Sequence, residues 1–103
     1  MGIRYKRTNG SQKSAVWSLP CKVSLGMFSS EWLVSVEIPD ERTIQTFVNK
    51  SSVIAQHAPT SNAQVDGRVK VSLVEYDPKT KSVLVDLPES TRLRVPESLV
   101  QQQ

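Results

Sequence analysis

The stretch Lys22-Val23-Ser24-Leu25 returns later in the chain as Lys70-Val71-Ser72-Leu73. Two further blocks match in the same order: VSVEIPD at 34–40 corresponds to VLVDLPE at 83–89, and VNKSSV at 48–53 corresponds to VPESLV at 95–100. Half-buried strands all share an alternating pattern, so coincidence is the alternative explanation. Because the blocks keep their order and their turns, the sequence predicts two similar units, at about 21–53 and 69–100, with a linker at 55–67.

Each unit has the pattern of a three-stranded β-meander. Val, Ile and Leu dominate the apolar residues, which favours strands over helices. On the best strand of the first unit, Trp32, Val34 and Val36 alternate onto one face. A short apolar segment at 14–19 should end at Pro20, because proline interrupts a sheet. Strands are expected at 22–25, 32–38, 43–48, 68–76, 82–87 and 91–95.

These units together predict the fold class. A three-stranded unit of about thirty residues buries too little surface to be stable alone, so the two units should pack against each other. The full length of 103 residues is that of one domain. We therefore predict an all-β domain at 14–103, a small barrel or sandwich of six to seven antiparallel strands, in which closure of the sheet removes exposed edges.

Residues 95–100, Val-Pro-Glu-Ser-Leu-Val, resemble the short helical turn that closes small barrels of the SH3 type. This resemblance implies an SH3-like barrel. Peptide-binding SH3 domains also carry an early Ala-Leu-Tyr-Asp-Tyr motif, which is missing here, and a ligand-contacting Tyr in the closing turn, whose place is taken by Leu99. The resemblance thus implies barrel geometry without recognition of Pro-rich peptides.

The positive charge of the chain is concentrated at its start. The net charge is +3, with a pI of about 9.2. Residues 1–22 hold five Lys or Arg and no acidic residue, whereas the other 81 residues hold eight basic and ten acidic groups. The sequence thus predicts a basic, flexible N-terminal arm at 1–13 on a nearly neutral domain.

This arm gives the chain a route to nucleic acid. Cationic side chains release counterions from phosphates, and an aromatic ring can stack on an unpaired base. Two arginines of the last predicted strand project from one side of it and could extend the positive face, although Glu89 and Glu97 should partly neutralise them. The alternative is a solubilising tail. The candidate nucleic-acid-binding residues are Arg4, Tyr5, Lys6, Arg7, Arg92 and Arg94.

No catalytic, cofactor-binding or metal site is predicted. The single His57 lies in a polar segment without a second metal-ligating nitrogen nearby, and the single Cys21 fits a buried structural position. Acidic pairs occur only at expected turns, and no Gly-rich loop or hydrolase motif is present. The lone cysteine, together with the lack of a signal-like or membrane-spanning apolar run, predicts a cytoplasmic chain without membrane contact.

The function expected from these patterns is a non-catalytic binding or adaptor module that contacts another protein. An exposed strand edge or a self-complementary face would serve this purpose, and a homodimer is one form it could take. The main alternative is a nucleic-acid-binding barrel, and a third class is an enzyme subunit whose site is completed by a partner chain. The larger aromatic side chains are expected in the core rather than in a ligand groove, namely Phe28, Trp32, Phe47 and Tyr76.

Overall fold

The computed structural model describes residues 16–39 and 41–102. Of these described residues 62% are in strands and 7% in helices, which confirms the predicted all-β class. Both helical segments are single 3₁₀ turns, η1 (Lys50–Ser52) and η2 (Glu97–Leu99). The strands are β1 (Trp17–Leu25), β2 (Glu31–Glu37), β3 (Thr43–Asn49), β4 (Val53–Ala55), β5 (Val65–Asp77), β6 (Ser82–Asp86), β7 (Arg92–Pro96) and β8 (Gln101–Gln102).

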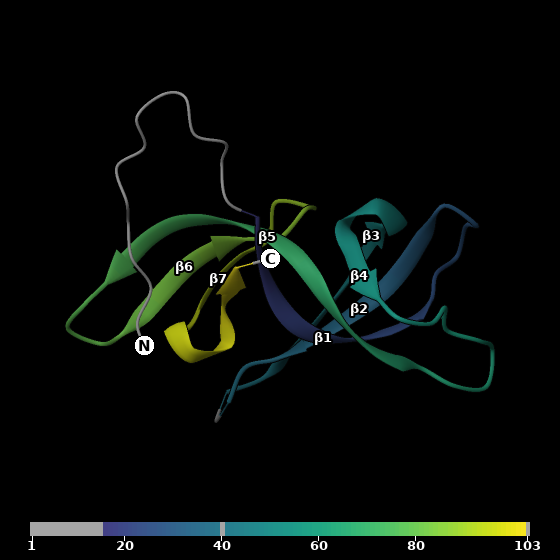
Figure 1. The fold of residues 1–103 in the computed structure, drawn as a ribbon, viewed down its shortest axis with the longest axis horizontal. Helices are drawn as coiled ribbons and strands as arrows, with labels where there is room; N and C mark the ends of the chain where they lie inside the picture. The colour runs from purple at the N-terminus through teal and green to yellow at the C-terminus, as the bar shows by residue number, and fades with distance from the viewer. Residues whose placement is uncertain (1–15, 40, 103) are drawn as a thin grey trace.

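The strands form one antiparallel sheet that curls into a half-barrel (Figure 1). Its order is β3-β2-β1-β5-β6-β7, with the two long strands β1 and β5 at the centre. Each of the two short strands pairs with a central strand of the other half of the chain, β4 with β5 and β8 with β1. The six longer strands are those expected from the sequence. No helix among the described residues is long and apolar enough to cross a membrane.

The prediction that Pro20 ends a segment was wrong, because β1 runs through it. Pro20 lies opposite Arg68 of β5, near the middle of the β1–β5 pairing. On the other side of β1, β8 pairs only as far as Ser18 and β2 pairs only from Lys22 onward. On this side of β1, Pro20 therefore lies between the residues that pair with β8 and those that pair with β2. A strand tolerates a proline there because no neighbouring strand needs its missing N–H.

The core lies on the concave side of the half-barrel. The alternation predicted for the strand at 32–38 is confirmed, since Val34, Val36 and Ile38 are buried and Trp32 packs against the core. Both halves contribute strand residues at alternate positions, and Val is the commonest residue type among them. The buried cluster consists of Leu19, Cys21, Val23, Val34, Val36, Ile38, Val48, Val69, Val83, Val85, Leu87, Leu93, Val95 and Val100.

The β2–β3 and β6–β7 connections have the same hydrogen bonds. In the first, the N–H of Ile38 donates to the carbonyl of Arg42 at 2.9 Å, and the N–H of Glu41 donates to Ile38 at 3.0 Å. In the second, Leu87 donates to Thr91 at 2.8 Å, and Ser90 donates to Leu87 at 2.9 Å. These turns lie in the blocks that match in sequence, although the division into two repeated units stays a prediction.

The predicted linker at 55–67 contains the beginning of β5, which starts at Val65. The segment between β4 and β5 also holds a tight turn, in which Thr60 and Ala63 exchange main-chain hydrogen bonds at 3.0 and 3.3 Å. At Gly67 the backbones of β4 and β5 approach closely, since a Cβ there would lie 2.9 Å from the carbonyl oxygen of Ile54. The absence of a side chain at this position therefore lets β4 pair with β5.

The side chain of Arg68 ties the two halves together. Its Nε donates to the hydroxyl of Ser18 at 2.7 Å, and one Nη donates to the carbonyl of Ser18 at 3.0 Å. The same Nη donates to the carbonyl of Leu99 at 3.1 Å, at the end of η2. Three elements, β5, β1 and η2, are thus joined by one planar guanidinium group.

Candidate interaction surface

The ends of the curved sheet are β3 and β7, on opposite sides of the molecule (Figure 1). Within residues 16–39 and 41–102, β3 pairs only with β2 and β7 pairs only with β6. A strand at a sheet edge presents main-chain N–H and C=O groups that can pair with another chain, and proteins commonly protect such an edge. The two edges of this sheet differ sharply in that protection.

The hydrogen bonds at the two ends of β3 show which of its residues bond to β2 and which are directed away from it. The N–H of Ile38 donates to Arg42 before the strand, and the N–H of Lys50 donates to Ser30 after it, at 3.0 Å. Hydrogen-bonded pairs alternate along an antiparallel ladder, so the even-numbered residues of β3 bond to β2. The main-chain groups of the odd-numbered residues are directed away from β2, and these are Thr43, Gln45, Phe47 and Asn49.

The sequence of β3, TIQTFVN, has no charged residue, proline or glycine. Phe47 is 39% exposed on the outer face, opposite the half-buried Leu33. Beside it, the Nε2 of Gln45 donates to the hydroxyl of Ser35 at 3.0 Å. The β3 edge thus combines unprotected main chain with an exposed aromatic ring, which are the two features that strand addition uses.

More apolar surface lies beside the Asn49 end of β3. The turn between β1 and β2 carries Met27 and Phe28, which are 76% and 69% exposed. This turn adjoins the end of β3 because Asn49 pairs with Glu31, whose Oε2 accepts a hydrogen bond from the N–H of Met27 at 3.2 Å. The expectation that the large aromatics lie in the core was therefore wrong for Phe28 and Phe47.

The two exceptions have simple causes. Phe28 lies in a turn, where no sheet covers it. Phe47 occupies a position of β3 whose side chain points to the outer face, because side chains alternate between the two faces of a strand. Trp32 and Tyr76, on strands β2 and β5, are half-buried against the core as expected. The Nζ of Lys50 lies 5.3 Å from the centroid of the Trp32 ring, a cation–π contact at the start of η1.

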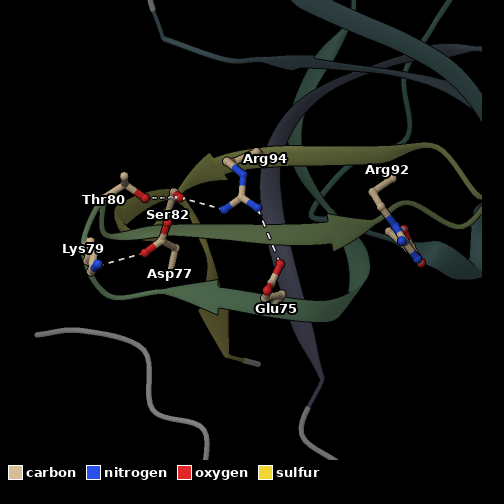
Figure 2. A network of polar contacts seen from close by, with 8 residues as sticks. Glu75, Asp77, Lys79, Thr80, Ser82, Arg92 and Arg94 are labelled. Atoms are coloured by element: carbon tan, nitrogen blue, oxygen red, sulfur yellow. Dashed lines mark hydrogen bonds and ion pairs between the residues drawn. The ribbon is translucent and has the colours of Figure 1, made fainter.

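The β7 edge carries charge and a proline. Arg92 forms a two-pronged ion pair with Asp86, with its Nε and Nη at 2.8 and 3.0 Å from the carboxylate oxygens. Arg94 donates to the hydroxyl of Ser82 at 3.0 Å and lies 3.7 Å from the carboxylate of Glu75 (Figure 2). β7 also ends in proline at position 96. Charged side chains and proline are devices that block edge pairing.

The structure describes two of the six candidate nucleic-acid-binding residues. Arg92 and Arg94 project from one face of β7, as the alternation of the strand requires. The other four candidates, Arg4, Tyr5, Lys6 and Arg7, lie outside the described residues.

The carboxylates that meet the two arginines of β7 differ from those expected. Asp86 and Glu75 make the ion pairs, not Glu89 and Glu97, because cross-strand neighbours lie closer than residues in the flanking turns. The guanidinium of Arg92 lowers the pKa of Asp86, chiefly through the hydrogen bond between them.

Of the two residues considered for catalysis, one is buried in the core and the other is exposed. Cys21 is 7% exposed, and burial raises the pKa of its thiol from 9.0 to about 11, so it remains protonated at neutral pH. His57 is exposed in the segment between β4 and β5. The part of the chain that the structure describes holds no group of three or more His, Cys, Asp or Glu that could bind a metal ion.

Sequence reasoning did not single out the β3 edge. A signal was present, since the seven residues between Arg42 and Lys50 lack charge, whereas β7 alternates Arg92 and Arg94 with apolar residues. It becomes informative only when both strands are known to lie at sheet edges. Comparison with known proteins finds no match to this chain among protein-family models, curated proteins or solved structures.

Proposed function

We propose that this chain is a non-catalytic binding module that acts through protein–protein interaction, with the β3 edge as its contact surface. The observation that carries the proposal is the difference between the two edges of one sheet. β7 has two ion-paired arginines and a proline, whereas β3 directs four sets of main-chain groups outward along an uncharged strand. An edge that is left unprotected while the opposite edge is blocked suits the addition of a strand from a partner.

The proposal includes an SH3-like barrel geometry. In each half, a one-turn 3₁₀ helix links an edge strand to a short strand that pairs on the far side of the sheet, as in β3-η1-β4 and β7-η2-β8. The N–H of the residue after each turn donates back to its first residue, Val53 to Lys50 and Val100 to Glu97. This arrangement supports the resemblance noted at residues 95–100. We also propose that the protein is cytoplasmic.

A nucleic-acid-binding role for the N-terminal arm is the second candidate. Its support is the charge distribution, since four of the thirteen Lys and Arg residues lie within residues 1–13, which hold no acidic residue. The described residues, by contrast, carry equal numbers of basic and acidic side chains. In this role the arm would bind phosphates, and the affinity would fall steeply with salt.

A capture experiment with two matched variants tests the proposal. The full chain, tagged and immobilised, is exposed to lysate of its source cells and washed at 50 and 500 mM salt, with and without nuclease. Phe47→Lys adds a charge to the outer face of β3, and Val74→Lys adds the same charge to a residue that is 40% exposed on β5, away from that edge.

Each outcome of the capture experiment is decisive. A protein that is retained at both salt concentrations by the wild type and by Val74→Lys, but lost from Phe47→Lys, supports a binding module that uses β3. Retention that disappears with salt or nuclease supports the nucleic-acid role instead. Equal retention by all three chains would show that β3 is not the contact surface.

A further inference from the structure

We propose that the partner strand at the β3 edge is β3 of a second copy of this chain, in an antiparallel dimer whose twofold axis passes through Thr46. This inference rests on the proposed function, because it assigns an occupant to the same edge. Closed twofold symmetry is the commonest arrangement of homo-oligomers, and it requires that one surface patch be complementary to itself. The sequence of β3 meets that requirement.

Pairing about Thr46 uses the outward main-chain groups in matched positions. Gln45 of each copy lies opposite Phe47 of the other, and Thr43 lies opposite Asn49. These four are the residues whose N–H and C=O groups are directed away from β2, so the pairing forms about eight main-chain hydrogen bonds. A shift by one residue would place outward groups opposite inward ones, and a shift by two would leave part of β3 unpaired.

The side chains also match in this register. On the core-facing side, Ile44 of each copy lies opposite Val48 of the other, so apolar side chains meet across the dimer axis. On the outer face, the Phe47 rings lie near the axis, and the amide of Gln45 is beside each ring. No charged residue lies within the paired segment of either copy, whereas a β7–β7 pair would bring four arginines together.

The size of the contact sets the expected affinity. Seven residues at about 3.4 Å each give a paired edge about 24 Å long. A single pair of strands is a small contact, so we expect its buried area at the low end of the range for specific interfaces. The exposed Phe47 ring adds apolar area near the axis, and the turn that carries Met27 and Phe28 adds apolar area at the margins. We expect the weak affinity of a small, transient contact, with a dissociation constant on the order of 10 to 100 μM.

The charged residues that flank β3 distinguish the proposed register of the β3–β3 pairing from its neighbours. Pairing about Thr46 places Arg42 of each copy opposite Lys50 of the other, one residue outside each end of the strand. This like-charge pair occurs twice in the dimer and weakens it. Replacing one member with an acidic residue converts both repulsive pairs into attractive ones, which happens in this register and not in its neighbours.

The first test compares two substitutions at one position by analytical ultracentrifugation of the full chain at 5 to 500 μM. Gln45→Pro removes an outward N–H that makes no bond to β2, and Gln45→Ala keeps that N–H while losing the same side-chain bond to Ser35. The wild type and Gln45→Ala should shift from 11.5 kDa toward twice that mass with concentration. Gln45→Pro should dimerise at least 10-fold more weakly, with circular dichroism confirming that it is folded.

The second test applies even if Gln45→Pro fails to fold. Lys50→Glu should tighten the dimer about 3- to 10-fold, whereas Lys79→Glu, the same charge change in the β5–β6 turn, should leave it unchanged. A wild-type chain that stays monomeric at 500 μM overturns the dimer, as does Lys50→Glu without an effect. A monomeric wild type that still captures a protein through β3 refutes only the dimer, whereas a dimer without such capture refutes the adaptor role.

Discussion

Replacing Arg68 tests whether one side chain joins the two halves of the molecule. Its guanidinium donates to the hydroxyl and carbonyl of Ser18 and to the carbonyl of Leu99, at 2.7 to 3.1 Å. Hydrogen bonds from a charged donor contribute about 1.5 to 3 kcal/mol each, and three that share one partly exposed group are not additive. We therefore expect Arg68→Ala to lower the free energy of unfolding by about 2 to 4 kcal/mol, a large part of the stability of a domain this size.

Urea unfolding followed by the fluorescence of the two tryptophans, Trp17 and Trp32, measures this loss. Arg68→Lys keeps the positive charge but lacks the planar fork, so it should recover less than half of the stability. Lys22→Ala is the matched control, because Lys22 pairs with Asp66 across the same two strands at an exposed position. An exposed ion pair contributes little to stability, so Lys22→Ala should change it far less than Arg68→Ala.

The outcome is informative in either direction. If Arg68→Ala costs no more than Lys22→Ala, the three hydrogen bonds do not hold the halves together. If Arg68→Lys is as stable as the wild type, charge rather than geometry carries the effect. Either result would refute the reasoning that a forked donor bridges β5, β1 and η2.

Three further predictions follow from individual residues. Burial raises the pKa of the Cys21 thiol to about 11, so the free energy of unfolding should decrease as the pH rises from 9.0 toward 11. In urea titrations at a series of pH values, Cys21→Ala should lack this decrease. Gly67→Ala should cost about 1 to 3 kcal/mol in thermal unfolding, since its Cβ would lie 2.9 Å from the carbonyl of Ile54. Arg92 lowers the pKa of Asp86, so the wild type should lose stability as the pH falls through that lowered pKa, and Asp86→Asn should show a flatter acid profile.

Much of the fold could be predicted because strand alternation is a local signal. Val34 and Val36 face the core as the pattern required, and the turns after Ile38 and Leu87 fall between the strands that the sequence predicted. The passage of β1 through Pro20 could not be predicted, since it depends on which strands pair on each side of β1. That information comes from residues far away in the sequence.

The surface was harder to predict than the strands. The exposure of Phe47 depends on the face of β3 that it occupies, and one residue of register decides that face. Glu89 and Glu97 were expected to neutralise the arginines of β7 because they flank them in sequence, whereas the ladder places Asp86 directly opposite Arg92. Which strands end the sheet is a property of the complete topology, so the contrast between β3 and β7 emerges only from the structure.

The pairing of β4 with β5 and of β8 with β1 has a consequence for the integrity of the chain. Each half supplies a strand that completes the sheet of the other, and β1 pairs with β5 along seven residues between them. A protease cut between Ala55 and Val65 would therefore break the peptide chain without separating the two fragments. The two fragments would stay associated through their main-chain ladders, and each would act as the template on which the other refolds.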